Sequence, residues 1–84
     1  MALIVKLTDD YGSNYYGPFD SIQEATDFVA RNLAEHEGTV EDGKHVYISV
    51  PNAYDETKPF KHLVGRIIEL NKNDYKPMSL KNGH

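Results

Sequence analysis

The 84-residue chain contains no cysteine. That absence excludes a disulfide framework and every thiolate metal site. A secreted domain of this size would usually need such cross-links, so the sequence indicates an intracellular, reducing compartment. We therefore expect a cytoplasmic protein.

Long apolar runs are also missing. The run at residues 2–5 is interrupted by Lys6 and then by Asp9 and Asp10. It is far shorter than the apolar stretch of a signal peptide or of a membrane-spanning helix. We expect neither an export signal nor a membrane contact.

Motifs that hold nucleotides or metals are absent as well. Neither G-x-G-x-x-G nor G-x-x-x-x-G-K occurs, so the sequence predicts no glycine-rich phosphate-binding loop. His36, His45 and His62 fall in separate predicted elements and lack H-x-x-x-H or E-x-x-H spacing. The sequence predicts no cofactor and no metal centre.

Asp9 and Asp10 are the one candidate pair of catalytic carboxylates. Aspartate in a hairpin turn commonly bonds its own backbone, and the sequence places no base or nucleophile beside this pair. The turn interpretation is the simpler one. We expect a protein that is not an enzyme.

What the chain does contain is the composition of an ordinary globular protein, with 39% hydrophobic and 26% charged residues. A chain this short hides only about 60 to 65% of its unfolded surface, so it has room for one thin core. We expect a single domain at residues 1–70, followed by a polar, flexible tail at residues 71–84.

Charge is distributed unevenly along the chain. Residues 1–42 carry nine acids against two basic residues, and residues 43–84 carry seven basic residues against four acids. The overall charge of −4 repels phosphates. We therefore expect no direct contact with nucleic acid.

The first half of the chain predicts a hairpin. Leu3, Val5 and Leu7 alternate with Ile4 and Lys6, which we interpret as the period-two pattern of a strand with one buried face. Residues 9–14 favour a turn, and a short second strand follows at residues 15–16. Gly17 and the proline after it are expected to end that strand.

A helix is predicted from Ser21 to about Glu37. Ser21 and Glu24 have the S-x-x-E spacing of a capping box. At about 100° per residue, one narrow arc of the helix is apolar, with Phe28 beside it; the arc holds Ile22, Ala25, Val29 and Leu33. Gly38 is expected to end the helix in a left-handed conformation.

The second half of the chain predicts another hairpin. Val46, Ile48 and Val50 alternate with less apolar residues in a strand that Pro51 ends. Residues 62–70 are apolar and β-branched, and their alternation breaks near Gly65, which predicts a bulge. The expected fold is therefore α+β, a two-layer β-β-α-β-β domain whose one helix packs on a small, mostly antiparallel sheet.

Residues 16–25, with the sequence YGPFDSIQEA, resemble a strand-to-helix junction, GPF-[DS]-S-x-x-E-A, of many small uncharacterised bacteriophage proteins. The resemblance covers about ten of the 84 residues. It implies a phage origin and no particular activity, because that loose group has no common function. In physical terms, these residues are expected to end a strand, place Phe19 in the core and start a helix.

Aromatic and acidic residues provide the candidate binding surfaces. The chain has six tyrosines, and tyrosine is enriched where proteins touch one another, although it also suits half-exposed strands. The acids of the helix face imitate a phosphate backbone in part, but Arg31 is placed to pair with one of them four residues earlier. The candidate contact residues are Asp9, Asp10, Tyr11, Glu24, Asp27, Glu35, Tyr54 and Phe60.

These observations favour a non-catalytic protein-binding module, a phage-like accessory protein that inhibits or modulates a host protein in the host cytoplasm. One alternative is an acidic, phosphate-mimicking inhibitor of a nucleic-acid-binding defence enzyme. Another is a small ligand-binding domain. The sequence leaves homodimerisation through an exposed sheet edge open.

Overall fold

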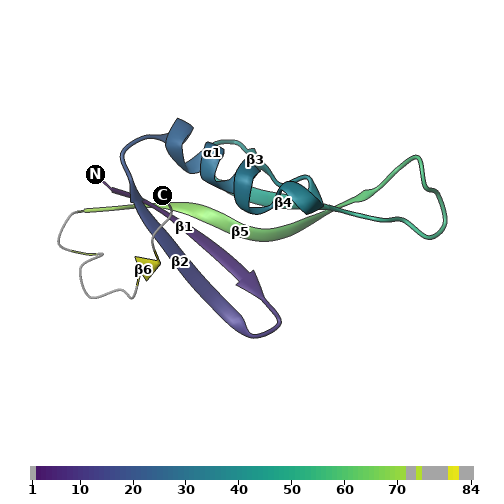
Figure 1. The fold of residues 1–84 in the computed structure, drawn as a ribbon, viewed down its shortest axis with the longest axis horizontal. Helices are drawn as coiled ribbons and strands as arrows, with labels where there is room; N and C mark the ends of the chain where they lie inside the picture. The colour runs from purple at the N-terminus through teal and green to yellow at the C-terminus, as the bar shows by residue number, and fades with distance from the viewer. Residues whose placement is uncertain (1, 72–73, 75–79, 82–84) are drawn as a thin grey trace.

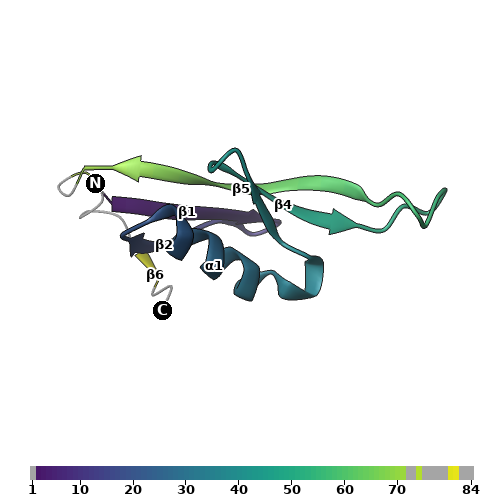
Figure 2. The ribbon, with the colours of Figure 1, turned by 90° about the horizontal axis from the view of Figure 1, so that it is seen from above.

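A computed structural model describes residues 2–71, 74 and 80–81. Within these residues one α-helix packs against one face of a six-stranded sheet, as Figures 1 and 2 show from two directions. The strand order is β3-β4-β5-β1-β2-β6, and every neighbouring pair except β2 and β6 is antiparallel. The predicted α+β fold, with one helix on a mostly antiparallel sheet, is confirmed.

β1 (Ala2–Asp9) and β2 (Gly12–Phe19) form the first hairpin. The prediction that Gly17 and its proline end the second strand was wrong, because β2 continues to Phe19. A register shift opposite residues 3–5 of β1 accommodates the two residues. Gly17 has a φ of 138°, which a side chain rarely adopts, so glycine is required there.

α1 (Ile22–Asn32) begins where the capping residues predict. The Ser21 hydroxyl oxygen accepts a hydrogen bond from the backbone N–H of Glu24 at 3.1 Å. The Glu24 carboxylate in turn accepts one from the backbone N–H of Asp20 at 2.9 Å. Both bonds satisfy donors that would otherwise be open at the start of the helix.

The helix ends earlier than the sequence predicts. α1 stops at Asn32, and a short 3₁₀ turn, η1 (Ala34–His36), follows it. Glu37, with a φ of 53°, takes the left-handed conformation expected of Gly38. Gly38 serves another purpose, since a Cβ at that position would lie 2.4 Å from the Cβ of Leu33.

β3 (Thr39–Glu41) and β4 (His45–Val50) form a second hairpin, of which the sequence analysis found only β4. The turn between them has positive φ values at Asp42 (58°) and Gly43 (62°). This is the two-residue Asp-Gly turn that matches the twist of antiparallel strands. That dipeptide was the signal from which β3 could have been predicted.

β5 (Phe60–Leu70) lies between β4 and β1 and pairs with both. Its pairing with β4 shifts between Gly65 and Leu63, so the bulge predicted near Gly65 is confirmed. The two-residue strand β6 (Leu80–Lys81) pairs in parallel with β2. Of the predicted polar tail, residues 72–73, 75–79 and 82–84 lie outside the described residues.

The core lies between α1 and the sheet. Phe28 is at its centre, with its ring centroid 5.0 Å from that of Tyr16 and 5.1 Å from that of Phe19. The prediction that Ile22 belongs to the buried stripe was wrong, because 41% of it is exposed. The buried residues of this cluster are Leu3, Val5, Phe19, Ala25, Phe28, Val29, Val46 and Ile67.

The ends of β4 and β5 extend past the rest of the sheet. We call residues 48–62 the arm: their strand segments pair with each other in the described structure and with no third strand. Figures 1 and 2 show the arm and its loop projecting beyond the C-terminal end of α1. The arm contributes to the elongated shape of the molecule, 47 × 27 × 19 Å.

Candidate functional site

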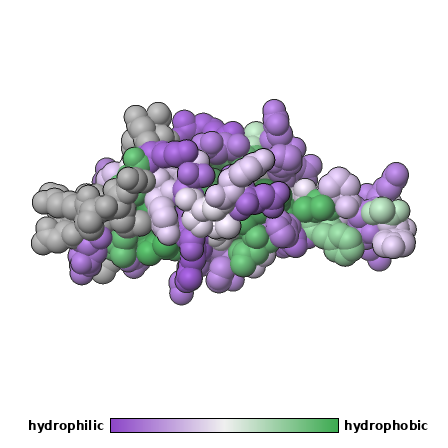
Figure 3. All heavy atoms as spheres, turned by 90° about the horizontal axis from the view of Figure 1, so that it is seen from below, coloured by the Kyte–Doolittle hydropathy of each residue, from purple (hydrophilic) through white to green (hydrophobic). Residues whose placement is uncertain are grey.

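The arm exposes large apolar side chains. Tyr54 in its loop is 98% exposed and Phe60 is 58% exposed. Leu63, just beyond the base of the arm, is 52% exposed. Figure 3 shows hydrophobic surface near the base of this projecting end, and mostly hydrophilic surface at its tip. Exposed apolar side chains gathered on one projecting element are typical of a contact surface.

Hydrogen bonds hold the loop that carries Tyr54. The side-chain oxygen of Asn52 accepts a hydrogen bond from the backbone N–H of Tyr54 at 3.0 Å. The side-chain nitrogen of Asn52 donates one to the carbonyl oxygen of Lys58 at 3.1 Å. One asparagine thus links both sides of the loop and fixes the backbone of Tyr54.

A second turn in the same loop is formed by Asp55. Its carboxylate accepts hydrogen bonds from the backbone N–H of Thr57 at 3.0 Å and from the Thr57 hydroxyl at 2.6 Å. These bonds stabilise the charged carboxylate and hold the pKa of Asp55 below its ordinary value. The backbone N–H of Lys58 also donates to the Asp55 carbonyl at 3.2 Å. The loop is therefore cross-linked internally.

An ion pair joins the arm to β3. The Lys61 ammonium lies against the Glu41 carboxylate. Hydrogen bonding to Glu41, together with its negative charge, raises the pKa of Lys61. Because β4 separates these two strands, the pair connects the base of the arm to the sheet edge.

The β1–β2 turn holds three of the predicted contact residues. The carboxylate of Asp9 accepts a hydrogen bond from the backbone N–H of Tyr11 at 2.8 Å. Asp10 is exposed, and Tyr11 is 99% exposed. Asp9 therefore has the ordinary turn role that the sequence suggests, and Tyr11 is a lone aromatic in solvent.

The predicted acidic helix face is divided between two elements. Glu24 and Asp27 lie on α1, whereas Glu35 lies in η1. The predicted ion pair between Arg31 and Asp27 was wrong: the Arg31 guanidinium donates to the Asp27 carbonyl oxygen at 3.3 Å. The Asp27 carboxylate instead accepts from the side chain of Gln23 at 2.9 Å. All three acids are exposed.

The structure does not bring the predicted contact residues together. Tyr54 and Phe60 are on the arm, Tyr11 is in the β1–β2 turn, Glu24 and Asp27 are on α1, and Glu35 is in η1; Figure 1 shows where these elements lie. Sequence reasoning also missed Asn52 and Leu63. The signal for Asn52 was an asparagine two residues before Tyr54, a spacing typical of side-chain-bonded turns.

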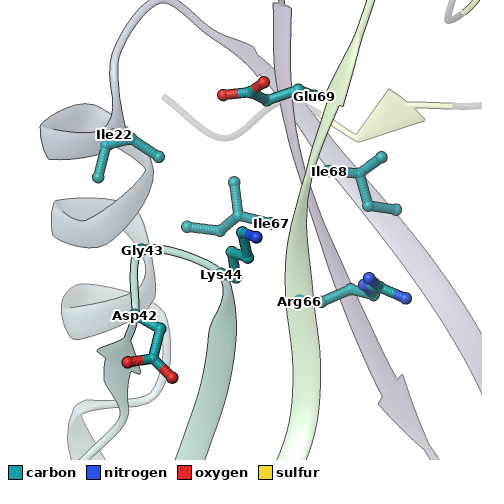
Figure 4. Close-up of a pocket in the computed structure, with 8 residues that line it drawn as sticks. All are labelled: Ile22, Asp42, Gly43, Lys44, Arg66, Ile67, Ile68 and Glu69. Carbon is teal, nitrogen blue, oxygen red and sulfur yellow. The ribbon is translucent and has the colours of Figure 1, made fainter.

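A hollow of about 460 Å³ lies beside the β3–β4 turn. Figure 4 shows Ile22 and Ile67 pointing into the space between α1 and β5, with Asp42 and Lys44 at the turn. Arg66 and Ile68 point away from the helix in the same view. The charged groups around this hollow have both signs, and they do not converge on one point.

Neither a metal-binding cluster nor a membrane-spanning helix is found in the part of the chain that the structure describes. Within residues 2–71, 74 and 80–81, no group of three or more histidines and acids is placed to hold a metal ion. In the same part of the chain, no helix has the length and apolar character needed to cross a bilayer.

Comparison with known proteins gave no relative for this chain. Protein-family models, curated proteins and solved structures all gave no match. The resemblance at residues 16–25 therefore stays a prediction, and the function has to be argued from the surfaces themselves.

Proposed function

We propose that this protein is a non-catalytic protein-binding module and that the arm, residues 48–62, is its contact surface. The observation that carries the proposal is the exposure of Tyr54 and Phe60 on an element that projects from the domain. Tyrosine in particular is enriched among the side chains that dominate the free energy of protein association.

The isolation of the arm supports this role. In the described structure the paired segments of the arm have no third strand beside them, and a two-stranded ribbon on its own is only marginally stable in water. Covering its apolar side chains with a partner removes that surface from water, at about 25 cal/mol for each Å². The partner would therefore stabilise the arm as well as bind it.

The hydrogen bonds of the loop support it further. Ordering a flexible loop on binding costs free energy, and a loop that is already ordered avoids much of that cost. Asn52 bonds the Lys58 carbonyl across the loop at 3.1 Å, and the side chains of Asn52 and Asp55 each bond a backbone N–H two residues on at 3.0 Å. The backbone that carries Tyr54 is held in one conformation before the partner arrives.

The biological setting is part of the proposal. The junction at residues 16–25 resembles that of small phage proteins, and the chain has no cysteine. Both features suit a phage accessory protein that acts on a host protein in the host cytoplasm. The partner is then a bacterial protein with an apolar pocket for one tyrosine ring.

Replacing Tyr54 by serine is expected to weaken binding to that partner by about 2 kcal/mol, or roughly 30-fold in Kd. The partner is identified by capture from bacterial lysate with the tagged, unmodified protein, purified, and titrated by calorimetry. Asn52→Ala is expected to weaken binding less than Tyr54→Ser. The tyrosine ring is still present in this variant, and only the hydrogen bonds that order its loop before binding are lost.

Tyr11→Ser is the matched control, since Tyr11 is equally exposed but lies in the β1–β2 turn. It is expected to leave the Kd unchanged. If Tyr11→Ser weakened binding and Tyr54→Ser did not, the contact surface would be the turn, and the arm would have to be abandoned as the binding element.

The acidic helix is a second candidate surface, favoured by the finding that Arg31 bonds the Asp27 carbonyl oxygen and not the Asp27 carboxylate. A phosphate-mimicking inhibitor would bind a basic groove, and its affinity would fall steeply with salt. We expect Asp27→Lys with Glu35→Lys to abolish such binding, measured by titration at two salt concentrations. Glu69→Lys on β5, an exposed acid outside both candidate surfaces, is the control, and equal loss there would exclude a localised acidic site.

A further inference from the structure

The sheet face opposite α1 carries a row of basic residues: a lysine, an arginine and a histidine. Residues paired across neighbouring strands lie side by side on one face. His45 on β4 pairs with Arg66 on β5, and Arg66 pairs in turn with Lys6 on β1. Lys6 pairs with Tyr15 on β2, so the row spans four strands, or about 14 Å at roughly 4.8 Å per strand.

We call His45, Arg66 and Lys6 the cationic row. Its face is the one turned away from the helix, because Val5 and Ile67, which flank Lys6 and Arg66 in sequence, are in the core. Figure 4 shows the Arg66 side chain directed away from α1. The row therefore lies on the open side of the sheet.

In the part of the chain that the structure describes, the basic side chains of the row have no acidic partner. Among the described residues, none forms an ion pair or a side-chain hydrogen bond with Lys6, Arg66 or His45. The neighbouring acid, Glu41, which pairs with His45 across β3 and β4, is bound to Lys61. The three side chains instead surround a hollow of about 180 Å³, together with Leu63 and Gly65.

Apolar and aromatic groups flank these cations. Tyr47 lies two residues from His45 on the same strand, with its ring centroid 6.4 Å from that of His45. Leu63 pairs with Tyr47 across the strands and is 52% exposed. Tyr15 lies at the other end of the row, and both tyrosines are only half-buried.

The net charge of −4 gives no sign of this basic surface, because it sums over all faces of the protein. The acids Glu24, Asp27 and Glu35 belong to the helical layer, on the opposite side of the sheet from the cationic row. Over distances of more than about 10 Å, exposed charges are largely screened at physiological salt. A ligand on the open face therefore meets the row rather than the average charge of the protein.

We propose that the open face of the sheet binds single-stranded nucleic acid, with phosphates on Lys6 and Arg66 and bases against Tyr47 and His45. Cations that follow a backbone and rings on which bases stack are the two parts of such a site. An acidic peptide would use the cations but would have no need of the rings. In a double helix the bases are stacked on one another and cannot stack on these rings.

The test uses the full protein and a fluorescently labelled oligodeoxythymidine of about 12 nucleotides, followed by fluorescence anisotropy. With two phosphates neutralised, the logarithm of the affinity should fall against the logarithm of salt with a slope of about −1.4. Binding should therefore weaken roughly sevenfold between 50 and 200 mM salt. Arg66→Gln and Lys6→Gln should each weaken binding and reduce the slope by about 0.7.

Lys58→Gln is the matched control, because it removes the same charge from the loop of the arm. It should leave affinity and slope unchanged; an effect equal to that of Arg66→Gln would overturn the site. Tyr47→Leu should weaken binding roughly fivefold or more with the slope unchanged, since it removes a ring and no charge. Circular dichroism checks that each variant is folded.

Two competitors identify the class of ligand. An unlabelled duplex of the same sequence should compete less well than the single strand, because its bases are already stacked. Polyglutamate should compete poorly. If polyglutamate or the duplex competed as well as the single strand, the proposal of a single-stranded nucleic acid site would be overturned in favour of a general anion surface.

Discussion

Replacing Gly65 by alanine is expected to destabilise the fold by about 3 kcal/mol or more. A Cβ at this position would lie 2.0 Å from the carbonyl oxygen of Lys6 on the neighbouring strand. That contact is with backbone, so no side chain can rotate to relieve it. The central pair of strands, β1 and β5, would have to separate at Leu7, the residue paired with Gly65.

The measurement is urea unfolding followed by circular dichroism. For a domain of this size, each kcal/mol also corresponds to about 4 to 8 °C in Tm. Gly43→Ala is the comparison: nothing lies within 4 Å of its added Cβ, but its φ is 62°. Gly43→Ala should lower the free energy of unfolding by about 1 to 2 kcal/mol, the cost of placing a side chain on a left-handed backbone. Equal losses at the two positions would contradict the close approach of β1 and β5.

Features determined by neighbouring residues could be predicted from the sequence. Ser21 and Glu24 start α1 because a capping box needs only four consecutive residues. The bulge at Gly65 was visible because the alternation of β5 breaks at that residue. Phe19 enters the core where the junction predicts it, with 1% of it exposed.

Features determined by tertiary contacts could not be predicted in the same way. The helix pattern continues beyond Asn32, but α1 ends there, and the backbone N–H of Gly38 bonds the Leu33 carbonyl at 2.9 Å. Ile22 has the right spacing for the stripe, yet it borders the hollow beside the β3–β4 turn and 41% of it is exposed. Periodicity identifies an apolar face and says nothing of how far the sheet extends beneath it.

The candidate surfaces show the same division. Tyr54 and Phe60 could be predicted as exposed aromatics, because both lie in or beside a long loop. The cationic row could not, since Lys6, His45 and Arg66 are far apart in sequence and meet only through strand register. The bulge also places Leu63 and Arg66, three residues apart, beside the same hollow.

Replacing Phe28 by alanine is expected to cost about 3 to 5 kcal/mol of folding free energy, the largest effect we expect on α1. Phe28 is 2% exposed, and its ring lies against those of Tyr16 and Phe19. Removing it leaves a cavity between the helix and β2. The stability of a domain of this size is of the order of 4 to 13 kcal/mol, so the variant should be close to unfolding at 37 °C.

Ile22→Ala on the same helix distinguishes the observed core from the one that periodicity predicts. Ile22 is 41% exposed, so truncating it should cost about 1 kcal/mol or less. If Ile22 belonged to a buried stripe, the cost would be about 2 to 5 kcal/mol. Both variants are measured by urea unfolding. A loss at Ile22 comparable with that at Phe28 would mean that α1 is rotated relative to the sheet, with its N-terminal turn against it.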